Sequence, residues 1–294
     1  MVRIWFILSI MVVSWVAQAS TSSATLEKIK KSGVITIGHR ESSIPFSYLD
    51  GDQKPVGYTM DLCLEVVEAV KKHLGMPTLA VKYLPISSQT RIPLVVNGTV
   101  DLECGSTTNS KARQKQVAFA VTHFIANIRV LTKKGLNINA LDDLKGNVVV
   151  TTAGSTADRF LKTITAEKSL RLRMVYGKDH SESFLMVETG RAEAFVMDDI
   201  LLAALVANSK NPAEFTIVGP VLTQEPYGIM MRRDDPAFRA LVNNALVALF
   251  NSGSAESSYK KWFLNAIPPK NINLNLPMSK ALQEAFKHPS DSGV

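Results

Sequence analysis

The sequence lacks most of the residue patterns on which enzyme and metal sites are built. Its 294 residues include only five histidines and two cysteines, and the histidines show no metal-ligand spacing. It contains no GxxxxGKS/T, HExxH, paired CxxC or GxSxG motif, so a P-loop, a zinc-protease site and a nucleophile elbow have no support. We therefore expect a protein without metal, cofactor or catalytic residues.

Long apolar runs are also scarce, and the one that stands out lies at the N-terminus. Residues 4–16 follow Arg3 and precede Ala17-Gln18-Ala19, which together have the basic start, short apolar core and small-x-small cleavage site of a secretory signal peptide. We interpret 1–19 as a cleaved signal peptide, with an uncleaved membrane anchor as the alternative. No cysteine follows the cleavage site, which argues against a lipoprotein, and no later segment is apolar enough to span a membrane.

The two cysteines, Cys63 and Cys104, are too few for a disulfide framework. An oxidising compartment would allow them to pair. Cys63 lies in a helical pattern and Cys104 in a strand pattern, so we favour two buried free thiols and keep a bridge as the alternative.

Charge of one sign does not dominate the sequence. The formal net charge is +7, and lysines and arginines are interspersed with acids instead of being gathered with aromatic residues. We therefore expect no nucleic-acid partner. A mildly basic chain suits a cleft for a small anionic ligand.

Hydrophobic periodicity predicts an α/β protein, of a length that usually forms two domains. Strands and helices alternate in the first part of the chain, which favours a parallel sheet with crossovers, and a second unit of similar rhythm occupies about 126–225. The predicted strands are 34–40, 80–86, 101–106, 124–135, 148–154, 172–177, 191–199 and 227–235, with a hairpin in 45–58. The predicted helices are 25–31, 59–74, 91–97, 236–252 and 255–265, with others starting after Ser110 and Ser155 and a short one after the extended loop 266–279.

The stretch DLECGSTTNSKARQKQVAFA, residues 101–120, carries the clearest chemical signal. A short strand breaks at Gly105 into small polar residues, and Ser110 is a suitable N-cap for a helix with Arg113 in its first turn. Hydroxyl groups, free backbone N–H groups and one guanidinium at a helix start suit a carboxylate or phosphate.

Other candidate ligand residues also follow strands or begin helices, and open α/β sheets bind ligands at these positions. Taken singly, each has an ordinary interpretation as a surface ion-pair partner or a helix cap. Together they suit a ligand with more than one carboxylate and an amine. The candidate set is Arg40, Ser88, Arg91, Ser106, Thr108, Arg113, Thr156, His180 and Asp198.

These segments resemble the periplasmic glutamate/aspartate-binding proteins of ABC transporters, within the type II amino-acid solute-binding proteins. The resemblance covers nearly all of the chain after the signal peptide. Thr108, Arg113 and Phe119 match the general family pattern, and the more specific likeness lies in GHRESS, PISSQTR, ECGSTT, KDHSESF, GRAEAFVMDD and IPPKNINLN.

The resemblance implies a role for each candidate residue. Arg113 would bind the ligand α-carboxylate with Thr108 and Thr156, and Asp198 with Ser106 would bind the α-ammonium group. The side-chain carboxylate would be bound by the remaining four residues, which are Arg40, Ser88, Arg91 and His180. This arrangement agrees with the charges, because buried cations and a buried acid would each meet an opposite charge on the ligand.

The resemblance further implies two Rossmann-like lobes joined by a two-segment hinge, the type II periplasmic binding protein fold. Lobe 1 would comprise 20–125 and 226–294, lobe 2 would comprise 126–225, and the hinge would lie near 124–127 and 225–227. The implied function is capture of L-glutamate or L-aspartate in the periplasm by a monomer that delivers it to the permease subunits of an ABC transporter, with no chemical conversion.

Two departures and two rival functions qualify this expectation. Ala120 stands where the family usually has Ser, and Met230 where well-known members of the branch have a cysteine. A lyase or dehydratase on the same fold would use His180 or Asp198 as acid and base. A ligand-sensing subunit of a receptor would use the same pocket with a different membrane partner.

Overall fold

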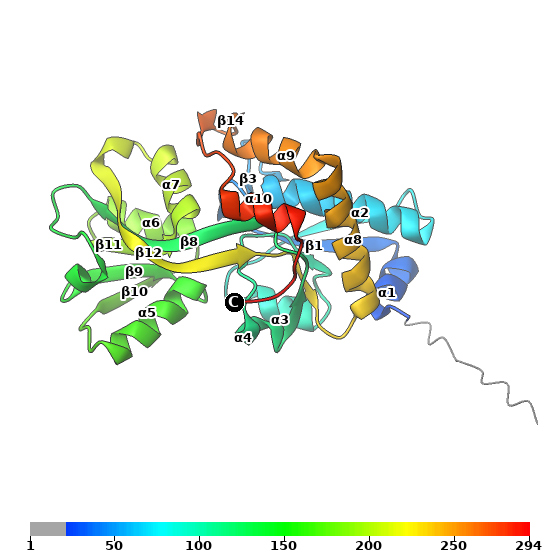
Figure 1. Cartoon of the computed structure of the whole chain (residues 1–294), viewed down its shortest axis with the longest axis horizontal. Helices are drawn as coiled ribbons and strands as arrows, with labels where there is room; N and C mark the ends of the chain where they lie inside the picture. Colours follow the sequence, from blue (N-terminus) through cyan, green and yellow to red (C-terminus); the bar gives the residue numbers. More distant parts are fainter. Residues whose placement is uncertain (1–21) are drawn as a thin grey trace, which may run out of the picture.

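The computed structural model describes residues 22–294 and contains two five-stranded sheets with helices packed on them (Figure 1). The predicted signal peptide, 1–19, lies outside the described residues. In the part of the chain that is described, no helix is long and apolar enough to span a membrane. The two sheets confirm the predicted α/β class.

The first unit is built on the sheet β5-β1-β6-β13-β7. Its strands are β1 (Val34–His39), β5 (Ala80–Pro85), β6 (Leu102–Glu103), β7 (Val117–Phe119) and β13 (Met230–Arg232). Its helices are α1 (Ala24–Ser32), α2 (Tyr58–Leu74), α3 (Arg91–Val96), α4 (Lys111–Gln114), α8 (Pro236–Ser252) and α9 (Ser254–Phe263). Helix α2 ends at Gly75, whose φ of 65° lies in the left-handed region that glycine reaches without strain.

The second unit is built on the sheet β10-β9-β11-β8-β12. Its strands are β8 (Phe124–Lys133), β9 (Val148–Thr152), β10 (Arg173–Gly177), β11 (Ala194–Asp198) and β12 (Phe215–Tyr227). Its helices are α5 (Thr156–Glu167), α6 (His180–Glu188) and α7 (Asp199–Asn208), with short 3-10 turns at Leu141–Leu144 and Pro212–Glu214. Helix α5 begins at the predicted cap, because the Ser155 side chain accepts a hydrogen bond from the Asp158 N–H.

The parallel pairing predicted for the first part of the chain is confirmed for β1 with β5 and β6, but four other strand pairs in the two sheets are antiparallel. β8 runs antiparallel to both β11 and β12, and β13 runs antiparallel to β6 and β7. Strand β12 was not predicted because Gly219, Pro220 and Pro226 interrupt its pattern. The structure accommodates the first two where the β8–β12 register shifts between Val218 and Thr223.

Strands β8 and β12 carry the chain from one unit to the other (Figure 1). At their shared end Phe124 pairs with Tyr227, and both rings pack on Phe46 of the first unit, with ring centroids 4.7 and 5.1 Å from it. Phe263 of α9 packs on Phe124 at 5.2 Å. Aromatic packing therefore fixes this end of both strands to the first unit.

The remaining elements lie around these two units. A small sheet consists of β2 (Ser42–Ser43), β3 (Ser47–Leu49) and β4 (Pro55–Val56). After α9 the chain forms β14 (Ala266–Ile267) and β15 (Ile272–Asn273), then α10 (Lys280–Lys287), and its last residues run back to α4 (Figure 1).

The expectation of two free thiols is wrong, because Cys63 of α2 and Cys104 form a disulfide. Helix α2 packs on the sheet with Cys63 on its buried face, and Cys104 is buried directly after β6. The two Cα atoms lie 6.3 Å apart. The two cysteines are 41 positions apart in the sequence. A helix pattern and a strand pattern do not predict that two such residues come close enough in space to pair. The bridge anchors the chain directly before the turn at Gly105.

Candidate functional site

The candidate residues converge where the two units face each other. From the first unit come the ends of β1 and β6 and the starts of α3 and α4, and from the second come the starts of α5 and α6 and the end of β11. Thr156 is partly exposed and the other eight are at most 5% exposed, namely Arg40, Ser88, Arg91, Ser106, Thr108, Arg113, His180 and Asp198.

The three arginines are buried with much of their hydrogen-bonding capacity unused. Arg113 Nη1 donates to the Thr108 carbonyl over 2.9 Å, and Arg91 Nη1 donates to the Thr107 hydroxyl. Both terminal nitrogens of Arg40, and the Nε atoms of Arg91 and Arg113, have no hydrogen-bond partner among residues 22–294. A buried cation with unused donors is costly unless an anion meets it.

The electrostatics of the site point the same way. Burial lowers the pKa of Arg40 to about 10, with a further contribution from the charge of Arg91. Burial likewise lowers the pKa of Arg113 to about 9, helped by the charges of Arg91 and Arg159. All three guanidinium groups stay protonated at neutral pH, so the site favours a ligand with negative charge.

His180 lies beside these cations as a neutral imidazole. Burial, and then the charges of Arg40 and Arg91, hold the pKa of His180 well below its usual range. Its Nδ1 lies 2.8 Å from the Thr152 hydroxyl, while its Nε2 has no partner in the described chain. Thr152 was not among the predicted site residues, although it lies in the predicted strand 148–154 and is the last residue of β9.

Two buried acids of the site were also missed. Glu103 has both carboxylate oxygens buried without a hydrogen-bond partner in the range 22–294. Burial lowers the pKa of Arg40 and of Arg91, and the charge of Glu103 opposes this lowering. In a strand with one buried face, Glu103 would lie on the solvent face, and Leu102 and Cys104 would lie on the buried face. β6 is instead a central strand that is buried on both faces, which the short pattern did not reveal.

The other missed acid, Glu225, lies near Asp198 at the end of the unpredicted strand β12. Asp198 accepts a hydrogen bond from the Tyr227 hydroxyl. Burial raises the pKa of Asp198 to about 8, with a further contribution from the charge of Glu225 and opposition from the Tyr227 hydrogen bond. The Oδ1 atom of Asp198 has no partner among residues 22–294 and can accept a hydrogen bond from an ammonium group.

The two units touch directly around this set of residues. The hydroxyls of Thr108 and Thr156 lie 3.5 Å apart across the boundary. Gly154 lies against Gln89, since a Cβ atom at position 154 would come within 3.1 Å of the Gln89 Cα and backbone nitrogen. The remaining two polar residues, Ser88 and Ser106, are buried in the first unit without a side-chain hydrogen bond in the described chain.

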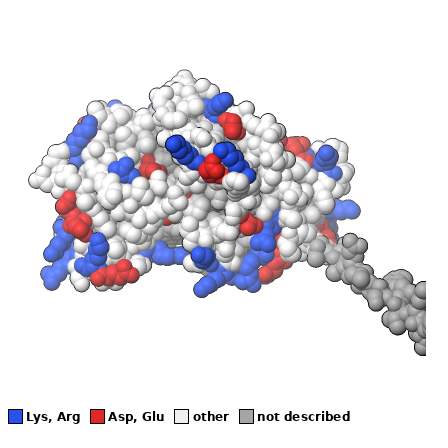
Figure 2. All heavy atoms as spheres, in the orientation of Figure 1, with Lys and Arg blue, Asp and Glu red and all other residues white. Residues whose placement is uncertain are grey.

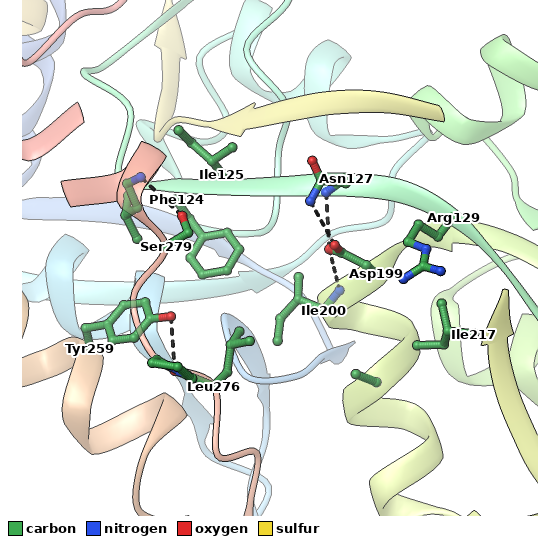
Figure 3. Close-up of a pocket in the computed structure, with 13 residues that line it drawn as sticks. Phe124, Ile125, Asn127, Arg129, Asp199, Ile200, Ile217, Tyr259, Leu276 and Ser279 are labelled. Carbon is green, nitrogen blue, oxygen red and sulfur yellow. Dashed lines mark hydrogen bonds between the residues drawn. The ribbon is translucent and has the colours of Figure 1, made fainter. Parts of the chain in front are cut away.

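A separate cavity of about 250 Å³, which we call the hinge-side cavity, lies across β8 between the units (Figure 3). Helices α7, α9 and α10 stand on this side of β8, and α4 and α5 stand on the other, where the candidate site lies (Figure 1). Asp199 faces this cavity and accepts hydrogen bonds from the Asn127 N–H and side-chain amide over 3.1 and 2.9 Å. The mainly apolar lining also includes Phe124, Ile125, Arg129, Ile200, Ala203, Ile217, Tyr259, Leu276, Pro277, Ser279 and Leu282.

Lys and Arg side chains are interspersed with Asp and Glu on the face shown in Figure 2, as the sequence predicted. Among residues 22–294, no group of three or more His, Cys, Asp or Glu side chains is placed to hold a metal ion.

A model of the bacterial extracellular solute-binding proteins, family 3, matches residues 35–265. The chain belongs to this family. The L-glutamate/L-aspartate-binding protein of Pseudomonas aeruginosa is 51% identical over 277 residues, which cover 94% of this chain and 92% of that protein. The glutamate/aspartate import solute-binding protein of Escherichia coli is 49% identical over 276 residues, which cover 94% of this chain and 91% of that protein.

Solved structures support the same fold. An arginine-binding protein from T. maritima superposes with a TM-score of 0.71 at 28% identity, covering 81% of this chain and 98% of that chain. A solute receptor for L-cysteine from Neisseria gonorrhoeae superposes with a TM-score of 0.71 at 26% identity, covering 82% of this chain and 94% of that chain. The type II periplasmic binding protein fold expected from the sequence is therefore confirmed, and these relatives are binding proteins.

Proposed function

We propose that this protein captures L-glutamate or L-aspartate between its two units and delivers it to the permease subunits of an ABC transporter. The observation that carries the proposal is the set of three buried arginines with unused donors, next to a neutral histidine and to Asp198, whose Oδ1 has no partner within residues 22–294. Such a set matches two carboxylates and one ammonium group. The relatives at 51% and 49% identity that bind or import these two amino acids support it.

The proposed pose follows from the unused atoms. Arg113, Thr108 and Thr156 bind the α-carboxylate, and Asp198 and Ser106 bind the ammonium group. The side-chain carboxylate meets the remaining residues, which are Arg40, Ser88, Arg91 and His180. Glutamine would leave part of this positive charge unmatched. Glutamate and aspartate differ by one methylene, which most pockets discriminate by only about 1 to 3 kcal/mol, so both acids are expected to bind.

In the proposed mechanism the units are lobes that close on the ligand. Lobe 1 comprises 20–125 and 226–294, lobe 2 comprises 126–225, and β8 and β12 supply the hinge near 124–127 and 225–227. The protein acts as a monomer in the periplasm after removal of residues 1–19. The disulfide between Cys63 and Cys104 fits such an oxidising compartment.

The test is isothermal titration of the refolded, ligand-stripped protein with L-glutamate, L-aspartate and L-glutamine, followed by mass analysis of the recovered ligand. One-to-one binding of both acids, much weaker binding of glutamine and an unchanged ligand are the expected results. An ancestral amino acid-binding protein of known structure, 28% identical with a TM-score of 0.70, is a precursor of cyclohexadienyl dehydratase. Recovery of an altered ligand would therefore favour an enzyme and contradict the proposal.

Affinity should fall as the pH is lowered below about 8, because burial where the two units meet raises the pKa of Asp198 to about 8. The carboxylate must lose its proton before it can pair with the ligand ammonium, so each pH unit below this value costs up to about tenfold in affinity. Titrations between pH 6 and 8 in buffers of different ionisation enthalpy should show proton release on binding. In Glu225→Gln the pH dependence should move to lower pH, since the charge of Glu225 helps to raise this pKa. A flat profile in the unmodified protein would contradict the ammonium role of Asp198.

Replacing Thr152 with the isosteric valine should weaken glutamate binding about five- to tenfold. With a carboxylate at Nε2, His180 carries its proton there, and the Thr152 hydroxyl donates to Nδ1 and fixes this tautomer. The loss of the bond to His180 costs about 1 kcal/mol, and the variant also removes the contact of the Thr152 hydroxyl with the Ser183 hydroxyl, 3.0 Å away. The neighbouring Thr151→Val, whose hydroxyl donates to the Val196 carbonyl instead, is the matched control. Equal affinities for the two variants would rule out this role of Thr152.

A further inference from the structure

The last residues of the chain form a strap over the turn that carries Thr108 and Arg113. We define the C-terminal strap as residues 290–294. The Lys111 N–H donates to the Val294 carbonyl over 2.9 Å, and the Val294 N–H donates to the Asn109 carbonyl over 3.2 Å. These two bonds join the strap to the turn in the manner of a short β-ladder.

The side-chain amides of the turn donate further hydrogen bonds to the same strap. The Asp291 carbonyl accepts from Asn109 Nδ2 over 2.9 Å and from Gln114 Nε2 over 2.8 Å. Gly293 fits so closely that a Cβ atom there would lie 2.8 Å from both the Lys111 nitrogen and the Ser110 carbonyl carbon. A side chain at position 293 would therefore push the strap and the turn apart.

The strap is itself held at its other end. The Thr122 N–H donates to the Ser290 carbonyl over 2.9 Å, and Asn243 Nδ2 of α8 donates to the Asp291 carboxylate over 3.1 Å. The strap thus links α8 and the chain entering β8 to the turn before α4, and Figure 1 shows the C-terminus beside α4.

The turn that carries Thr108 and Arg113 has few other contacts on the side where the strap packs. Helix α4 has only four residues, and Arg113 is the only one of them that is buried. The inner side is fixed by the Asn109 N–H, which donates to the Pro226 carbonyl, and by the Thr107 carbonyl, which accepts from the Gly228 N–H. A single isolated helical turn is not stable by its own hydrogen bonds, so the strap supplies the second support.

We propose that the C-terminal strap is a positioning element for the α-carboxylate subsite and holds Arg113 and Thr108 ready before the ligand arrives. This inference rests on the proposed function, since it assigns a role within that site. A preorganised turn loses less conformational entropy when the ligand binds, which strengthens binding without any contact between strap and ligand.

The test compares Gly293→Val with Ser292→Val in the full chain. The first places a side chain against Lys111, whereas Ser292 is exposed and its side chain makes no hydrogen bond within residues 22–294. We expect Gly293→Val to bind L-glutamate about tenfold more weakly and Ser292→Val to bind like the unmodified protein. Asn109→Ala, which removes the hydrogen bond from the Asn109 side chain to the Asp291 carbonyl, should also weaken L-glutamate binding.

Amide hydrogen exchange separates positioning from general destabilisation. In ligand-free Gly293→Val the Lys111 amide should exchange faster, while the Asn109 amide, which donates to Pro226, should stay protected and the melting temperature should change little. Faster exchange at Lys111 with unchanged affinity would overturn the inference. Unchanged exchange at Lys111 would also overturn it, because the strap would then not be holding the turn. If the unmodified protein bound neither acid, the proposed function itself would have failed, which is a distinguishable result.

Discussion

Replacing Arg113 with methionine should reduce the affinity for L-glutamate at least a hundredfold. Arg113 is 2% exposed, its Nη1 donates to the Thr108 carbonyl, and its Nε has no partner within residues 22–294. In the proposed pose it pairs with the ligand α-carboxylate, and removing one partner of such a buried charge pair costs about 3 to 5 kcal/mol. Isothermal titration or competition with a labelled ligand measures the loss.

The matched control is Arg159→Met, which also removes one positive charge. Arg159 is exposed, and its charge contributes to the lowered pKa of Arg113. A screened surface charge should change the affinity by no more than about threefold. The melting temperature of ligand-free Arg113→Met should be equal to or higher than that of the unmodified protein, because a buried cation without an anion destabilises the fold. Comparable losses in the two variants would mean that Arg113 acts only through long-range charge.

A side chain at Gly154 should weaken binding about a hundredfold by keeping the two units apart. Gly154 has a φ of 77°, and an added Cβ would lie 2.9 Å from Gln89 Cγ and 3.1 Å from the Gln89 Cα and backbone nitrogen. Asparagine is the variant to use because it tolerates this backbone region best among the larger residues. The closed arrangement becomes less favourable, so the ligand must supply the free energy that separates the open and closed forms.

The control for backbone strain is Gly190→Asn. Gly190 has a similar φ of 73° but nothing lies within 4 Å of its added Cβ. Both variants should lose a similar small amount of stability, whereas only Gly154→Asn should lose affinity. Small-angle scattering with saturating glutamate should show a larger radius of gyration for Gly154→Asn. Equal affinity of the two variants would show that the Gly154–Gln89 contact does not limit closure.

Local signals in the sequence were enough to place several candidate residues at the ends of their helices and strands. The Ser110 cap was predicted from its position, and its hydroxyl accepts from the Arg113 N–H over 3.4 Å. The sequence predicted Arg40 at the end of a strand and Arg91 at the start of a helix, and the structure agrees to within one residue, because both features depend on a few neighbouring residues.

What the sequence did not reveal depends on distant pairings. The bridge between Cys63 and Cys104, the burial of Glu103 on a central strand and the contact of Tyr227 with Asp198 all require elements that meet only in the folded chain. Strand β12 was missed because it is stabilised by β8 despite its proline and glycine residues. Tertiary contacts outweigh local propensity at these positions.

The hinge-side cavity lies on the side of β8 opposite the proposed ligand-binding residues. If the units rotate about β8 and β12 as proposed, widening the ligand side must narrow the opposite side, and α7 must approach α9 and α10. The open form would then bury apolar walls such as Ile200 and Leu276, which face the cavity of about 250 Å³ in the present form. The free energy of the open form would therefore depend on the side chains that line the hinge-side cavity. Substitutions in this lining could change the affinity while every ligand-binding residue stayed the same.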